Sequence, residues 1–71
     1  MPQFCQVTSD NGLNIRTEPH TQAPIVANDP KGTTLNFVEI VNGEMIEGNP
    51  HWGHSEQGHY YWMGGTDHPN R

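Results

Sequence analysis

The sequence predicts an all-β fold, a small barrel of about five to six short, strongly bent antiparallel strands. The chain has only 71 residues, which limits it to one domain with a small core. It contains 8 Gly and 6 Pro, which suit short strands joined by turns better than helices. Runs of strand-forming residues alternate with turn clusters, and no segment has the periodicity of a long helix.

The first two predicted strands flank a tight turn. Residues 4–8 (FCQVT) are rich in strand formers, and residues 9–12 (SDNG) form a turn cluster. A second strand is expected over residues 13–17, in which Leu13 and Ile15 alternate with polar residues. Because successive side chains of a strand point to opposite faces, we expect Leu13 and Ile15 to face the core.

The middle of the chain predicts a loop and the longest strand. Residues 18–24 (EPHTQAP) contain two prolines and little apolar content, which is typical of an exposed loop. We expect a short strand over residues 25–27 and a turn over residues 28–32. Residues 33–41 (TTLNFVEIV) carry large apolar side chains of both parities, which predicts a β-bulge or a strong bend near residues 37–38.

Turn signals divide the remaining chain. The NG pair at residues 42–43 lies between apolar residues and predicts a type I′ hairpin turn, whose central positions both need positive φ. A further turn is expected at residues 48–50, then a strand around Trp52 and a turn at residues 55–58. The aromatic run YYWM at residues 60–63 follows.

The remaining general features concern domain extent, thiol and charge. One domain is expected over residues 1–66, with residues 67–71 as a flexible tail. Cys5 is the only cysteine, so no internal disulfide forms, and we expect it to be a small buried strand residue. The net charge of −5 opposes nucleic acid and anionic membranes. We find neither a signal peptide nor a membrane span.

The segment LNIRTEP at residues 13–19 resembles the L-N-[VI]-R-[ST]-x-P signature of bacterial SH3-like (SH3b) domains. Residues 21–26 resemble the family's T-S-x-x-[VI]-[VI], residues 31–33 its K-G-T, and Trp52 the tryptophan after its central hairpin. The four pieces follow the family's order over most of the chain. The segment before Trp52 is longer than usual, and YWMGG at residues 61–65 replaces the usual G-Y-V-[SH].

The resemblance implies an SH3-like barrel in which residues 18–24 correspond to the RT loop. It also implies a recognition domain of cell-wall hydrolases and other envelope proteins, one that holds an attached enzyme on peptidoglycan peptide. The family has no catalytic residues, and the resemblance implies no cofactor.

Four aromatic residues are crowded toward the C-terminus: Trp52, Tyr60, Tyr61 and Trp62. In a strand Tyr60 and Trp62 point opposite to Tyr61 and Met63, so at most one of these pairs fills the core. We expect the other pair to form an exposed binding platform. Alternatively, all four aromatics close the barrel, and the sequence leaves open which pair faces solvent.

Glu18 and His20, in the predicted loop, are the other candidate ligand-binding residues. If the family geometry holds, they lie beside the aromatic platform, where the Glu18 carboxylate would pair with a peptide amine. The alternative is that Glu18 is an ordinary solvated charge. Arg16 is expected to form a salt bridge on the outer face.

Neither a metal site nor a catalytic site is predicted. His51, His54 and His59 are close in sequence, but their spacing matches no standard zinc pattern, and a pH-sensitive surface is the other interpretation. No nucleophile, base and orienting group are expected to assemble, because so small a core leaves no deep cleft. We therefore predict that the protein is not an enzyme.

The functional prediction is a non-catalytic module that recognises a peptide, cell-wall peptidoglycan peptide above all, and targets an attached enzyme. The alternative is a protein–protein interaction or structural module that packs on a neighbouring domain or partner. A monomeric module of a larger parent protein is expected, located in the cell envelope or outside the cell; a cytoplasmic location is also compatible with the sequence.

Overall fold

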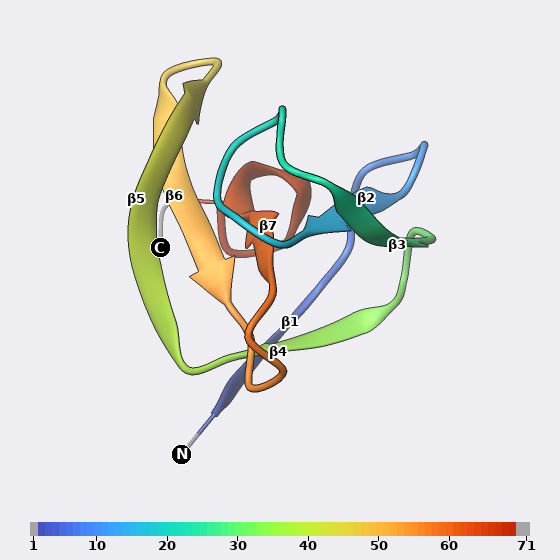
Figure 1. Ribbon diagram of the computed structural model, residues 1–71. Helices are drawn as coiled ribbons and strands as arrows, with labels where there is room; N and C mark the ends of the chain where they lie inside the picture. The colour runs from blue at the N-terminus through green and yellow to red at the C-terminus, as the bar shows by residue number, and fades with distance from the viewer. Residues whose placement is uncertain (1, 70–71) are drawn as a thin grey trace.

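Seven antiparallel strands and one short 3-10 helix form residues 2–69, the part of the chain that the computed structural model describes (Figure 1). The elements in chain order are β1 (Gln3–Gln6), β2 (Leu13–Arg16), β3 (Ile25–Asp29), β4 (Thr34–Phe37), β5 (Glu39–Ile46), β6 (Asn49–His54), β7 (Tyr60–Trp62) and η1 (Met63–Gly65). The protein is thus a small all-β antiparallel domain, as its turn-rich composition predicts.

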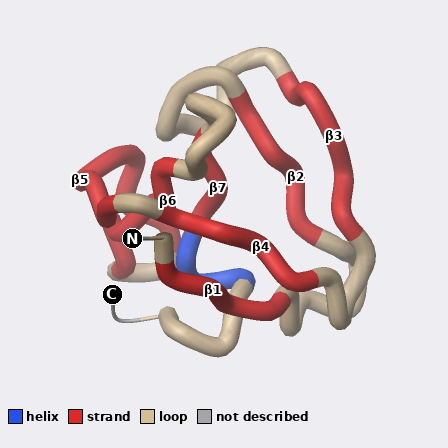
Figure 2. The backbone as a smooth tube through the Cα atoms, turned by 90° about the horizontal axis from the view of Figure 1, so that it is seen from below, coloured by secondary structure: helices blue, strands red, loops and turns tan. Residues whose placement is uncertain are grey.

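The strands form two sheets. One contains β1 and β4, and the other has the order β3-β2-β7-β6-β5 (Figure 2). Within the described residues the sheets do not close into a barrel, because the end strands of both sheets, β1 and β4 in one and β3 and β5 in the other, each keep one edge without a paired strand. There are more strands than the five to six predicted, because the segment at residues 33–41, predicted as one long strand, is divided between β4 and β5.

The division between β4 and β5 lies at Val38. The chain bends there, and the Val38 amide donates to the carbonyl of His54 at 2.8 Å. Phe37 before the bend is buried, and Ile40 after it packs against the same core, although the two residues differ in parity. The predicted bend at residues 37–38 is confirmed, and it accounts for the imperfect alternation of the segment.

The hairpin turn between β5 and β6 is not where the sequence predicts it. β5 continues through Asn42 and Gly43, and the turn falls at Glu47 and Gly48, whose φ values are 51° and 82°. The predicted turn at residues 42–43 is wrong, because Gly43 is a strand residue at which only glycine leaves room for its neighbours. A Cβ there would lie 2.7 Å from Cδ1 of Trp52, so glycine permits a close approach.

The core lies between the two sheets. Leu13 and Ile15 of β2 are buried there, as predicted. The hydroxyl of Tyr61 donates to the carbonyl of Asn36 at 2.8 Å and lies 3.6 Å from the Cys5 sulfur. Burial raises the pKa of both the Cys5 thiol and the Tyr61 phenol. The whole buried cluster comprises Cys5, Val7, Leu13, Ile15, Phe37, Tyr61 and Met63.

The C-terminal segment returns to the first strand. Thr66 is buried and forms an isolated antiparallel bridge with Val7. The amide of Asp67 donates to the Gln6 carbonyl at 3.0 Å, and the Asp67 carboxylate accepts from the Gln6 amide at 2.9 Å. The predicted tail begins at Asp67, and its last two positions, 70 and 71, lie outside the described residues. No helix within residues 2–69 is long and apolar enough to cross a membrane.

Candidate peptide-binding surface

The strand β7 divides its side chains between two faces of the sheet. Tyr61 of β7 and Met63, which begins η1, point into the core, with exposed fractions of 1% and 0%. Tyr60 and Trp62 lie on the outer face and are half-buried. Core packing decides the parity that the sequence leaves open, because Gly53 on β6 makes room for Tyr61. A Cβ at Gly53 would lie 2.8 Å from the Tyr61 ring.

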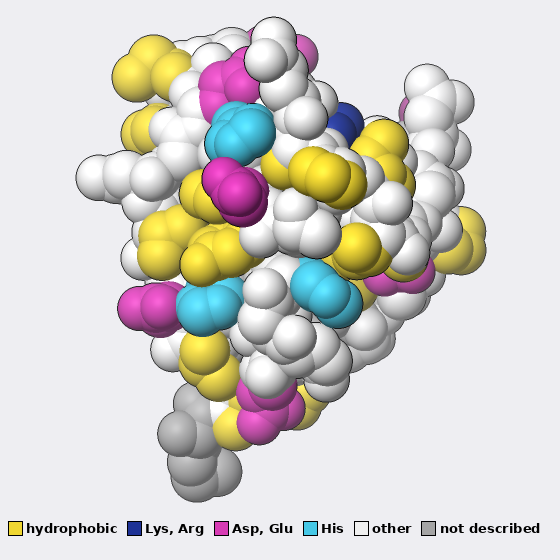
Figure 3. Space-filling model, viewed as in Figure 1, with side chains coloured by type: hydrophobic (Ala, Val, Ile, Leu, Met, Phe, Trp, Pro, Cys, Tyr) yellow, Lys and Arg dark blue, Asp and Glu magenta, His cyan; other side chains and the backbone are white. Residues whose placement is uncertain are grey.

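A row of polar and aromatic side chains crosses the outer face around Tyr60. Tyr60 pairs with Arg16 on one side and His54 on the other, and His54 pairs with Glu39. The rings of His54 and Tyr60 stack with centroids 4.5 Å apart and planes within 6°. His54 Nδ1 lies 2.7 Å from a Glu39 carboxylate oxygen. Figure 3 shows histidines and acidic side chains gathered around apolar ones on this side of the molecule.

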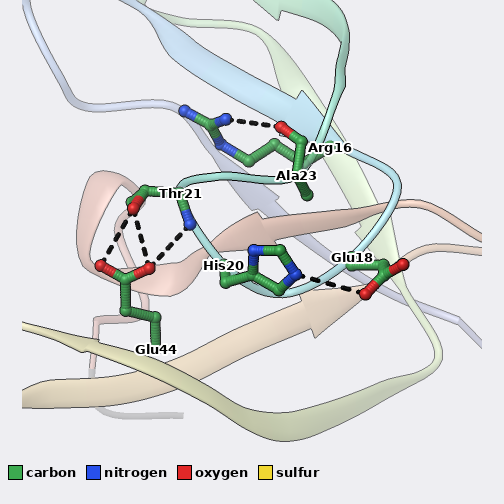
Figure 4. Close-up of polar contacts among 6 residues, drawn as sticks. All are labelled: Arg16, Glu18, His20, Thr21, Ala23 and Glu44. Carbon is green, nitrogen blue, oxygen red and sulfur yellow. Dashed lines mark hydrogen bonds and ion pairs between the residues drawn. The ribbon is translucent and has the colours of Figure 1, made fainter.

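The predicted exposed loop is confirmed at residues 17–24, and hydrogen bonds close it on itself. The Thr17 amide donates to the Pro24 carbonyl at 3.1 Å. The Arg16 guanidinium donates to the Ala23 carbonyl at 2.8 Å (Figure 4). Arg16 forms no salt bridge within the described residues; it braces the loop instead of the predicted ion pair.

A second set of contacts fixes the loop on β5. The Glu44 amide donates to the Pro19 carbonyl at 2.9 Å. The Glu44 carboxylate accepts from both the amide and the hydroxyl of Thr21, each at 2.8 Å, as Figure 4 shows. These bonds, the one from the Thr21 amide above all, lower the pKa of Glu44. Glu44 therefore ties the loop to β5 through hydrogen bonds.

Trp52 lies under the loop and is 1% exposed. Its indole Nε1 donates to the Glu44 carbonyl at 2.9 Å, and its ring packs against Gly43. Ala23 of the loop is also buried, and neither residue belongs to the inner core cluster. Two predicted ligand contacts, Trp52 and Tyr61, are thus covered by protein, one by the loop and one by the core. They offer no surface for stacking.

The loop leaves Glu18 and His20 accessible. Their side chains are 66% and 44% exposed, and His20 Nε2 lies 3.2 Å from a Glu18 carboxylate oxygen. Glu18 follows two residues after Arg16, the strand partner of Tyr60. The loop thus leaves the strand β2 beside the strand position of Tyr60, while Trp52 and Tyr61 are buried.

Trp62 stands over a separate small hollow. With Leu13, Thr21 and Trp52 it lines a space of about 160 Å³. Its indole Nε1 donates to the Asn49 carbonyl at 2.9 Å, which holds the ring in place.

The ligand-binding residues predicted from the sequence leave out three residues of the surface, Glu39, Glu44 and His54, of which His54 is considered only for a metal or pH-sensitive site. The Glu44–Thr21 contact joins positions 23 apart and has no local signal. Strand alternation carries a signal for His54, which has the same parity as Trp52 on β6 and so shares its face.

The other histidines lie away from this row. His59 lines a hollow next to Ser55 and Gln57, and the buried Nδ1 of His51 has no hydrogen-bond partner in the described structure. Within residues 2–69 no group of three or more His, Cys, Asp or Glu side chains is placed to hold a metal ion.

Comparison with known proteins yields no relative: no family model, no curated protein and no solved structure matches the chain.

Proposed function

We propose that this domain is a non-catalytic peptide-binding module with an SH3-like barrel topology, which holds an attached enzyme on cell-wall peptide. The motif at residues 13–19 supports the topology, as do two sheets joined by one sharply bent segment at Val38. The fixed loop on the outer face supports the binding role.

The observation that carries the proposal is the contrast between a braced loop backbone and accessible loop side chains. Bonds from Arg16 and Glu44 fix the loop, while the side chains of Glu18 and His20 stay accessible, shortly after Arg16, the strand partner of Tyr60. A loop whose backbone is already fixed loses less conformational entropy when a ligand binds, because only its exposed side chains have to be ordered.

The chemistry of the surface selects a cationic or neutral peptide. The Glu18 carboxylate would accept hydrogen bonds from a peptide amine, and the stacked rings of Tyr60 and His54 would contact its aliphatic part. The net charge of −5 attracts cations at long range. The surface is shallow, so retention on a polymer relies on many sites or on a linked domain.

The test is co-sedimentation of the purified domain with insoluble peptidoglycan. We expect the domain to pellet, and we expect the double variant Tyr60→Ala/Glu18→Gln to stay in the supernatant. The matched control is Phe4→Ala/Glu56→Gln, which removes an exposed aromatic ring and an exposed carboxylate outside this surface. Equal pelleting of both double variants would refute the proposed surface. A wild-type domain that stays in the supernatant would refute the ligand.

A further inference from the structure

A second hollow lies between the free edges of β3 and β4. It measures about 250 Å³, and Val26 and Ala27 of β3 line it opposite Thr34 and Leu35 of β4. Figure 2 shows these two strands at the open side of the fold, each with a neighbour on one edge only. The hollow is therefore the place where the two sheets fail to close.

One carboxylate faces this hollow from the core side of the sheet. Ala27 pairs with Ile15 and Asp29 pairs with Leu13, and both partners on β2 point inward. Directly opposed residues share a face, so Ala27 and Asp29 also point inward. Asp29 lines the hollow, and its carboxylate forms no hydrogen bond or salt bridge within the described residues.

Several other polar groups of the hollow already have partners, and the side chains of Thr34 and His59 also line it. The Asn36 amide donates to the Gln57 side chain at 3.2 Å, and the Tyr61 hydroxyl donates to the Asn36 carbonyl. Ser55 accepts from the His59 amide. No Lys or Arg lines the space. Ile15, Val26, Ala27 and Leu35 add apolar walls, so the complementary group is an aliphatic chain that ends in a cation.

The volume of the hollow and the unpaired strand edges indicate what kind of molecule carries that cationic group. A volume of 250 Å³ falls below the roughly 300 Å³ at which sites for drug-sized ligands begin, so it fits one side chain. β3 also exposes Ile25 and Val26, with exposed fractions of 53% and 45%. An exposed apolar edge strand is a template to which an extended peptide adds by main-chain hydrogen bonds.

We infer that the hollow between β3 and β4 binds the side chain of a lysine carried by an extended peptide, with Asp29 accepting its ammonium group. The peptide backbone pairs with the free edge of β3, and the aliphatic part of the lysine packs on Ile15, Val26 and Leu35. This site is separate from the loop surface and does not depend on the function proposed for it.

The test is an NMR titration of the ¹⁵N-labelled domain with a blocked tripeptide in which one lysine lies between two valines. We expect saturable shifts of the Ala27 and Leu35 amides and little change at His20 or Thr21. The same peptide with norleucine keeps the aliphatic chain but lacks the amine, and should bind at least about fivefold more weakly. Asp29→Asn should abolish the preference for lysine while leaving the spectrum otherwise folded.

Free butylamine separates the side-chain site from strand addition. We expect it to bind more weakly than the lysine tripeptide, because it forms no main-chain bonds to β3. Butylamine of equal affinity would overturn the peptide part of the inference. Equal binding of the lysine and norleucine peptides, or unchanged selectivity in Asp29→Asn, would overturn the role of Asp29 and leave it as an inward charge that protects an edge strand from aggregation.

Discussion

The two faces of the sheet around β6 are buried in different ways. On the inner face Tyr61, Met63 and their neighbours form an apolar cluster from five elements of the chain and the bridge at Val7. On the outer face Trp52 packs against Gly43 of β5, next to a loop that is held mainly by hydrogen bonds to Glu44 and Arg16. The inner face therefore defines the fold, and the outer face positions polar groups over it.

The comparison shows how a chain of 71 residues supports an exposed polar surface. The loop contributes only Ala23 to the buried apolar residues, so packing alone holds it weakly. Directional bonds supply the remaining constraint and leave Glu18 and His20 in solvent. The predictions below separate the two kinds of burial.

Trp52→Ala should have the largest effect. It removes a fully buried ring and should cost about 3–5 kcal/mol, close to the whole stability of a small domain. Urea unfolding of Trp52→Ala and of Trp62→Ala, whose ring is half-exposed, provides the comparison, with Trp52→Phe for use if the first variant is unfolded. Equal losses from the two alanine variants would contradict the burial of Trp52.

Gly43→Ala should have the next largest effect. The added methyl group would clash with the Pro19 carbonyl and the Trp52 ring, which should cost about 1–3 kcal/mol and displace the loop. Gly48→Ala is the matched control, because its φ of 82° causes backbone strain but its Cβ meets open space. Amide shifts of His20 and Thr21 should change in the first variant only.

Tyr61→Phe tests the inner face with a smaller change. The ring stays, but the Asn36 carbonyl loses its hydroxyl donor, which should cost about 1–2 kcal/mol. Tyr60→Phe serves as the control, since the Tyr60 hydroxyl forms no hydrogen bond within the described residues, and it should shift stability by less than about 0.5 kcal/mol. Thermal unfolding of both variants measures the difference.

The smallest effect concerns Glu44 and acid. The pKa of Glu44 is lower in the folded protein than in the unfolded chain. The stability that the ionised carboxylate adds to the folded loop is therefore complete above the unfolded pKa of about 4.3 and is lost as pH falls through the folded pKa. Hydrogen exchange of the Thr21 amide should therefore lose protection in acid. In Glu44→Gln that acid-dependent loss should be absent. The same pH dependence in both proteins would show that another group controls the loop.

Local patterns predicted most of the strands but not the contacts between distant segments. Alternation placed Leu13 and Ile15 in the core, and the mixed parity of residues 33–41 predicted the bend at Val38. The NG pair at residues 42–43 misled, because the approach of the loop outweighs its turn preference there.

The candidate surface was predictable only in part. Glu18 and His20 are accessible in the predicted loop, but both parities of β7 are aromatic, so nothing local identified Tyr61 as the buried one. That choice depends on Gly53, a residue on another strand.

The proposed binding surface is tested most directly by an NMR titration of the ¹⁵N-labelled domain with the peptides that an amidase releases from purified peptidoglycan. The account predicts saturable shifts at Glu18, His20 and Tyr60, and their loss in the Tyr60→Ala/Glu18→Gln variant. Shifts confined to β1 and β4, or no shifts at saturating peptide, would contradict it.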